Sequence, residues 1–125
     1  NDSTTDGNNI SPTQVFTITS NGNASLLNIL TCVSVTETSD IALKTNIETI
    51  PNALEKINLM RGVSFERIDN NTSSVGLIAQ ELEKIAPELV SNDQEYKSIS
   101  YSHLTAYLIE AIKELNNEIK ELKGN

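Results

Sequence analysis

An apolar stripe near the C-terminus constrains this chain most strongly. Its members recur at alternating spacings of four and three over about three heptads, which predicts a long helix that packs against a partner helix. The Ile and Leu order favours two strands in an isolated coiled coil, and Glu118 and Lys123 favour parallel neighbours. An amphipathic helix packed on its own subunit is the alternative. This stripe, called the seam below, consists of Tyr101, Thr105, Leu108, Ile112, Leu115, Ile119 and Leu122.

Composition supports assembly and excludes several classes of protein. The 125 residues contain 4% aromatics and no Trp, so a single chain can build only a modest core and we expect an oligomer. The net charge of −8, without a Lys or Arg cluster, argues against a nucleic-acid partner. Cys32 and His103 offer neither a disulfide nor a metal site, and we expect no cofactor. No apolar run approaches the ~20 residues of a membrane span.

The N-terminal pattern predicts the end of a β-rich body. Residues 1–12 are rich in Asn, Asp, Ser and Thr, which predicts a linker. Residues 15–19 alternate apolar side chains with Thr, Asn21-Gly22 is a turn signal, and a second apolar run extends over 26–35. We therefore expect two strands joined by a turn.

After Lys44 the pattern changes to short helices and short strands. Asn52 and Glu55 have the spacing of a capping box, which predicts a helix that Gly62 closes. A second helix is predicted to end at Pro87, and Ser102 is predicted to cap the long last helix. The remaining predicted elements are a hairpin of 63–68 with 73–77, the second helix at 79–86, and a short strand at 97–101.

A hydroxyl and an amine stand five residues apart at Ser39 and Lys44, where the two patterns meet. A serine is a poor nucleophile until a base takes its proton, and a lysine can be that base if burial or a cation lowers its pKa. Neither a helix nor a strand brings positions i and i+5 together. A bend, or packing from a neighbouring subunit, is therefore required. The alternative is that Ser39-Asp40 is only a helix cap or a turn.

Several motifs follow one another in a recognisable order. They are Ser39-Asp40-x-x-Leu43-Lys44-x-Asn46-Ile47, Gly76-Leu77-Ile78-Ala79-Gln80-Glu81, Pro87-Glu88-Leu89-Val90 and Tyr101-x-x-Leu104-x-x-x-Leu108-x-x-Ala111-Ile112-Lys113-Glu114-Leu115. Through these motifs the chain from Ser39 to about Leu122 resembles the intramolecular chaperone autoprocessing domain of the peptidase S74 family. That domain occurs at the C-termini of phage endosialidases, tail fibres and neck appendages, and it resembles the autocleaving region of myelin regulatory factor proteins.

The resemblance implies an α+β fold whose last helix forms a parallel trimeric bundle, with the seam at Leu108, Ile112, Leu115, Ile119 and Leu122. Residues 1–38 would be the end of a fibre or tailspike client, and residues 39–125 its chaperone. The precursor would be made in the host cytoplasm and carried in the virion, and the chaperone would be released. A myelin regulatory factor-like protein is the alternative source, and the acidic, Thr- and Asn-rich upstream segment favours the viral one.

By the same resemblance the domain is a self-cleaving serine endopeptidase. Ser39 would be the nucleophile, Lys44 its base and Thr38-Ser39 the scissile bond, with Asp40, Gly76 and Gln80 as supporting residues; the Gly76 amide region is a candidate oxyanion hole. The chain departs from the family pattern at two positions: Ser74 stands where some members have His, and Ala42 where Arg is common. A structural registration module without cleavage therefore stays an alternative. A Ser/His/Asp hydrolase using His103 is another, without a nucleophile-elbow pattern to support it.

Overall fold

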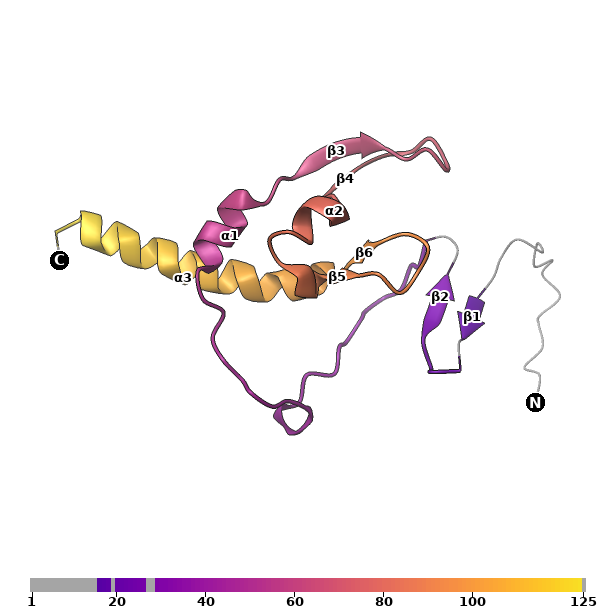
Figure 1. The fold of residues 1–125 in the computed structure, drawn as a ribbon, viewed down its shortest axis with the longest axis horizontal. Coiled ribbons are helices and arrows are strands. Elements are labelled where there is room, and N and C mark those ends of the chain that lie inside the picture. The colour runs from indigo at the N-terminus through magenta and orange to yellow at the C-terminus, as the bar shows by residue number, and fades with distance from the viewer. Residues whose placement is uncertain (1–15, 19, 27–28, 125) are drawn as a thin grey trace. The chain divides into compact units, whose positions relative to one another are not determined.

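The chain divides into two compact units, Asn1–Lys44 and Thr45–Asn125, each described here by itself. The computed structural model describes residues 16–18, 20–26 and 29–124 (Figure 1). The expected linker at 1–12 and the ends of the first expected strand lie outside these residues. Short helices, small antiparallel hairpins and a long C-terminal helix make the fold α+β, as predicted.

The first unit contains one small hairpin. Strand β1 (Phe16–Ile18) pairs antiparallel with β2 (Ala24–Leu26), and Gly22 has a φ of 84° in the turn between them. This confirms the predicted hairpin. The second strand was predicted to reach Val35, which is wrong: residues 29–35 form no strand. Val33 is fully exposed there, because a lone two-stranded hairpin offers no third strand or sheet face to hold this apolar run.

The second unit is built on two packed helices. Helix α1 (Ala53–Leu59) lies against the long helix α3 (Leu104–Leu122) (Figure 1). Side chains from α1, α3 and the segment between them share one small core. Its fully buried members are Ala53, Leu82, Ala86, Leu89, Tyr107 and Ala111.

The segment between α1 and α3 carries two hairpins and a helical turn. The predicted hairpin is confirmed, with Val63 opposite Gly76 at its base. A second, smaller hairpin pairs Val90 with Ile99, and Pro87–Leu89 forms a 3₁₀ turn before it. The elements are β3 (Val63–Glu66), β4 (Ser73–Gly76), α2 (Ala79–Leu82), β5 (Val90–Ser91) and β6 (Ser98–Ile99).

Several helix boundaries differ from the prediction. Helix α1 ends at Leu59, before Gly62, and α2 ends at Leu82. Residue 86 precedes a proline, which disfavours the helical region for it, so the chain leaves α2 through a turn at 83–85. Ser102 does not cap α3, because the 3₁₀ turn Tyr101–His103 precedes the helix.

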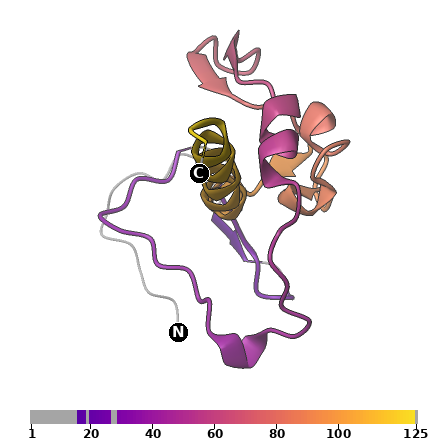
Figure 2. The same cartoon turned by 90° about the vertical axis from the view of Figure 1, so that its left-hand side faces the viewer.

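Helix α3 has one covered face and one uncovered face. Tyr107 and Ala111 are buried on the covered face. Figure 2 looks along α3 and shows α1 and α2 on one side of it. The seam lies about 100° around the helix from the buried residues. Its five aliphatic members from Leu108 to Leu122 remain 42% to 86% exposed, so no described element of the second unit covers this part of the seam.

Candidate functional site

A short turn occupies the end of the first unit. The Asp40 carboxylate accepts a hydrogen bond from the Ala42 amide at 2.8 Å and so caps the 3₁₀ helix Ile41–Leu43. The Lys44 amide then donates to the Ile41 carbonyl at 3.0 Å, and the Leu43 amide donates to that of Asp40 at 3.2 Å. Asp is a strong capping residue because its short side chain reaches backbone amides two or three residues ahead. The turn reverses the chain between positions 39 and 44.

This turn brings the Lys44 amine onto Ser39. The Nζ atom of Lys44 lies 2.5 Å from the Ser39 Oγ and 2.6 Å from the Ser39 carbonyl oxygen. The sequence left open whether a bend or a neighbouring subunit would join the two side chains. In this structure the bend does so within one chain.

The pair is open to solvent. Thr38, Ser39 and Lys44 are all exposed in the described chain. A charged ammonium can donate to the serine hydroxyl but cannot accept its proton, so a basic role requires the neutral amine. Burial disfavours the charged form of a lysine. The two side chains are therefore in hydrogen-bond contact, and the burial that would favour a neutral amine is absent from this exposed turn.

Gly76 has a packing role in the second unit. A Cβ atom placed on Gly76 would lie 2.6 Å from the Tyr101 hydroxyl oxygen, so a larger residue would displace that side chain. The same hydroxyl accepts a hydrogen bond from the Leu77 amide at 2.8 Å. The β3–β4 hairpin is thus joined to the first residue of the seam. Gln80, the other motif residue, is exposed on α2 and borders an open groove of about 500 Å³ beside Tyr101.

Glu114 is a functional residue that the sequence reasoning missed. Its two carboxylate oxygens accept hydrogen bonds from the Ala53 amide at 3.0 Å and the Leu54 amide at 2.9 Å, which are the first two residues of α1. The predicted capping box fails because Asn52 is in the left-handed conformation, with φ 54°, and its side chain makes no cap hydrogen bond. Carboxylates favour helix N-termini because the dipole is positive there. No local spacing predicts a cap supplied from 60 residues away.

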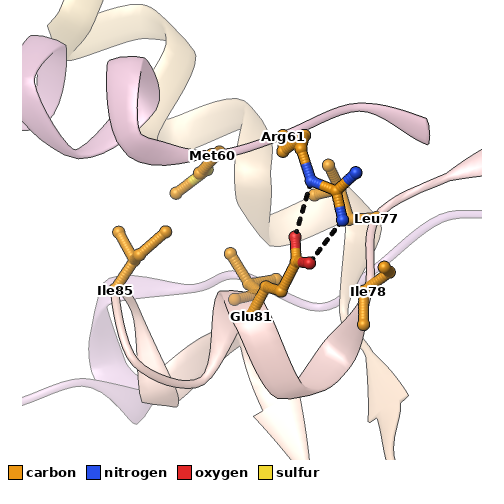
Figure 3. Close-up of a pocket in the computed structure, with 7 residues that line it drawn as sticks. Met60, Arg61, Leu77, Ile78, Glu81 and Ile85 are labelled. Atoms are coloured by element: carbon orange, nitrogen blue, oxygen red, sulfur yellow. Dashed lines mark hydrogen bonds and ion pairs between the residues drawn. The ribbon is translucent and has the colours of Figure 1, made fainter.

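Ion pairs tie the small elements of the second unit together. Arg61 follows α1, and its guanidinium donates two hydrogen bonds, of 2.5 and 3.2 Å, to the Glu81 carboxylate of α2. This pair lies beside a small apolar hollow (Figure 3). The hydrogen bond and the charge of Arg61 lower the pKa of Glu81. Lys97 similarly lowers the pKa of Glu83, and the Nζ–Oε2 distance is 2.9 Å. These pairs are partly or fully solvated, so each contributes little to stability, and they serve mainly to fix orientation.

The described residues contain neither a cluster of metal ligands nor a membrane-spanning helix. Among residues 16–18, 20–26 and 29–124, no group of three or more His, Cys, Asp or Glu side chains could hold a metal ion. Within the same residues, no helix has both the length and the apolar character to cross a membrane.

The first unit ends in a serine–lysine pair, and the second unit is a small α+β body that ends in a helix with an uncovered seam. The family model for the chaperone of endosialidase, of the peptidase S74 type, matches residues 39–91. Residues 39–91 are thus similar to this family, whose domains are of the self-cleaving peptidase type. The match begins at Ser39, the residue that Lys44 contacts.

Curated relatives extend the likeness on both sides of the family match. The long tail fiber protein Gp37 of Enterobacteria phage M1 is 38% identical over 96 residues, which cover 68% of this chain. Gp37 of Enterobacteria phage K3 is 32% identical over 69% of the chain, and Gp37 of Salmonella phage S16 is 33% identical over 89%. The chain spans 38%, 8% and 17% of these three relatives, so it is similar to a part of each.

Proposed function

We propose that residues 39–125 are an intramolecular chaperone that assembles three copies of a tail fibre chain and then releases itself by cutting the Thr38-Ser39 bond. The observation that carries this proposal is the 2.5 Å contact between the Lys44 Nζ and the Ser39 Oγ. It lies at the first residue of the family match, where a processing site would separate client from chaperone. Residues 1–38 are then the end of the client.

The proposed chemistry uses only these two side chains and water. The neutral Lys44 amine takes the Ser39 hydroxyl proton while Oγ attacks the Thr38 carbonyl carbon. The C–N bond breaks as the ester C–Oγ bond forms, and the leaving Ser39 nitrogen takes up a proton to become an amine. Water then hydrolyses the ester, which leaves a Thr38 carboxylate and restores the serine hydroxyl.

Assembly supplies what the solvated pair lacks. The exposed aliphatic seam on α3 is suited to a second and a third copy of the same helix, since apolar heptad positions bury against one another. Trimer formation would also exclude water around the turn at 39–44 and favour the uncharged lysine. Cleavage would therefore wait for assembly.

The relatives point to a tail fibre as the client. They are named long tail fiber proteins of phages, and the likeness to the S16 protein covers 89% of this chain. We therefore place the precursor in a virion tail fibre made in the host cytoplasm, with the chaperone part leaving after the cut.

Cleavage is tested on the expressed chain by denaturing electrophoresis and intact mass. We expect two products, residues 1–38 and 39–125, in the wild type. Ser39→Ala and Lys44→Ala should leave one full-length species, whereas His103→Ala and Lys120→Ala should cleave normally. Products that persist at the same rate in Lys44→Ala would refute the assigned base.

Assembly is tested separately by native mass in the uncleavable Ser39→Ala chain. We expect three subunits. Ile112→Asp, which puts a charge in the middle of the seam, should give monomers, and Asn117→Asp, which adds the same charge at an exposed position of this helix away from the seam, should not. A monomeric wild type that still cleaves would break the link between assembly and activation.

A registration module that never cleaves is the second candidate. It is favoured by the solvent exposure of Ser39 and Lys44 and by the second hydrogen bond from the amine to the Ser39 carbonyl. An intact trimer of the wild-type chain, stable for days, would select this function.

A further inference from the structure

We infer that Asp40 is a positioning residue for the serine–lysine pair, acting as a hydrogen-bond acceptor that caps the turn and not through its negative charge. The inference rests on the proposed cleavage function. It also assigns the order of events: the pair is formed by local structure in each single chain, and assembly controls only the loss of the lysine proton.

The first support is the chain of contacts from Asp40 to Ser39. The carboxylate oxygen holds the Ala42 amide, and the Ile41 carbonyl receives the Lys44 amide that follows. These two bonds fix the residues across which the direction of the chain reverses. The Lys44 side chain then reaches both the hydroxyl and the carbonyl of Ser39.

The second support is that the Asp40 carboxylate accepts its hydrogen bond from a backbone amide, a role that an uncharged oxygen would fill as well. The donor is the Ala42 amide, and within the described turn no ion pair joins Asp40 to Lys44. Asn and Ser cap as well as Asp does, because each carries an oxygen at the same reach. Ala has none, so the turn would then form only part of the time.

The third support is that the turn depends on no other element. All residues from 37 to 44 are exposed, and the hydrogen bonds that define the turn lie between residues 39 and 44. A turn made by local bonds forms before slower assembly steps. Approach of the amine to the hydroxyl is therefore not the step that awaits a partner subunit.

The test compares single-turnover cleavage of Asp40→Asn, Asp40→Ser and Asp40→Ala with the wild type across pH. We expect Asn and Ser to cleave within about twofold of wild type and Ala to be about fivefold slower, the usual effect of losing one cap. The midpoint of the pH–rate profile should be the same in all four chains. Native mass confirms that each variant assembles.

Two results would overturn the inference. If Asp40→Asn were as slow as Asp40→Ala, or if the pH midpoint moved in either, the carboxylate would act by its charge. If Asp40→Ala matched the wild type, the cap would be irrelevant. Neither result affects the proposed function, which fails only if the wild type does not cleave or Ser39→Ala does.

A second readout keeps the inference testable without cleavage. In the uncleavable Ser39→Ala chain, nuclear Overhauser effects between the Lys44 ε-protons and the methyl protons at position 39 report the approach directly. We expect them to persist with Asn at position 40 and to weaken with Ala. Equal intensity in both variants would refute the positioning role.

Discussion

Removing the Glu114 carboxylate should loosen the start of α1 from α3. The two oxygens hold the amides of Ala53 and Leu54, and Ala53 is fully buried, so water cannot replace the carboxylate at that amide. Glu114→Ala leaves both amides without this acceptor. Glu114→Gln keeps one oxygen but turns an amide donor toward the second N–H.

The magnitude follows from these two bonds. A hydrogen bond to a charged group contributes about 1.5 to 3 kcal/mol, and an unsatisfied buried donor costs about 1 to 3 kcal/mol. Because Glu114 is only half-buried, we expect about 3 kcal/mol for Glu114→Ala and about 1.5 kcal/mol for Glu114→Gln. For a unit of this size, a loss of 3 kcal/mol lowers the Tm by about 12 to 24 °C.

The assay is urea and thermal unfolding followed by circular dichroism in the Ser39→Ala background, at one protein concentration because assembly adds stability. Glu121→Gln is the matched control, since Glu121 is exposed two turns further along α3. Its free energy of unfolding should stay within about 0.5 kcal/mol of the parent. If Glu114→Gln behaves like Glu121→Gln, the cap across the two helices does not stabilise the unit.

Two further predictions concern tyrosine hydroxyls. Gly76→Ala should lower the free energy of unfolding by about 1 kcal/mol, because the added methyl group displaces the Tyr101 hydroxyl from the Leu77 amide. A double-mutant cycle should show that this cost mostly disappears in the Tyr101→Phe background. An unchanged cost in that background would refute the role of the hydroxyl. Burial, with a hydrogen bond to Glu88, raises the pKa of Tyr107 to about 12, above the unfolded value of about 10. The neutral tyrosine therefore stabilises the fold up to pH 10, and this contribution should disappear between pH 10 and 12. The free energy of unfolding of Tyr107→Phe should fall less than that of the wild type between pH 10 and 12. An equal fall in both chains would contradict the raised pKa of Tyr107.

Local patterns predicted the elements whose signals are local. The β3–β4 hairpin and the long helix α3 were read from alternation, a turn and heptad spacing, and all are present. The sequence indicated that a bend or a neighbouring subunit must join Ser39 to Lys44, because neither a helix nor a strand brings side chains five residues apart together. It did not predict the 3₁₀ turn that forms this bend.

The errors arose where distant residues decide the structure. The cap of α1 comes from Glu114, so the apparent capping box at Asn52 was misleading. The apolar run that continues past Leu26 has β propensity, but no strand in the described residues pairs with it. In both cases the local sequence pattern was present. A distant residue in the first case, and the lack of a pairing strand among the described residues in the second, decided the structure.

The difference between the covered and the uncovered face of α3 has a kinetic consequence. The face at Tyr107 and Ala111 is satisfied within one chain, so folding of the second unit is a first-order process that dilution does not slow. In the proposed assembly the uncovered seam is buried by collision with other copies, so this burial would have a rate that rises with concentration. Under that proposal, newly made chains would accumulate as folded subunits whenever expression is low, and three such ends held together by one fibre would raise their local concentration enough to remove that delay.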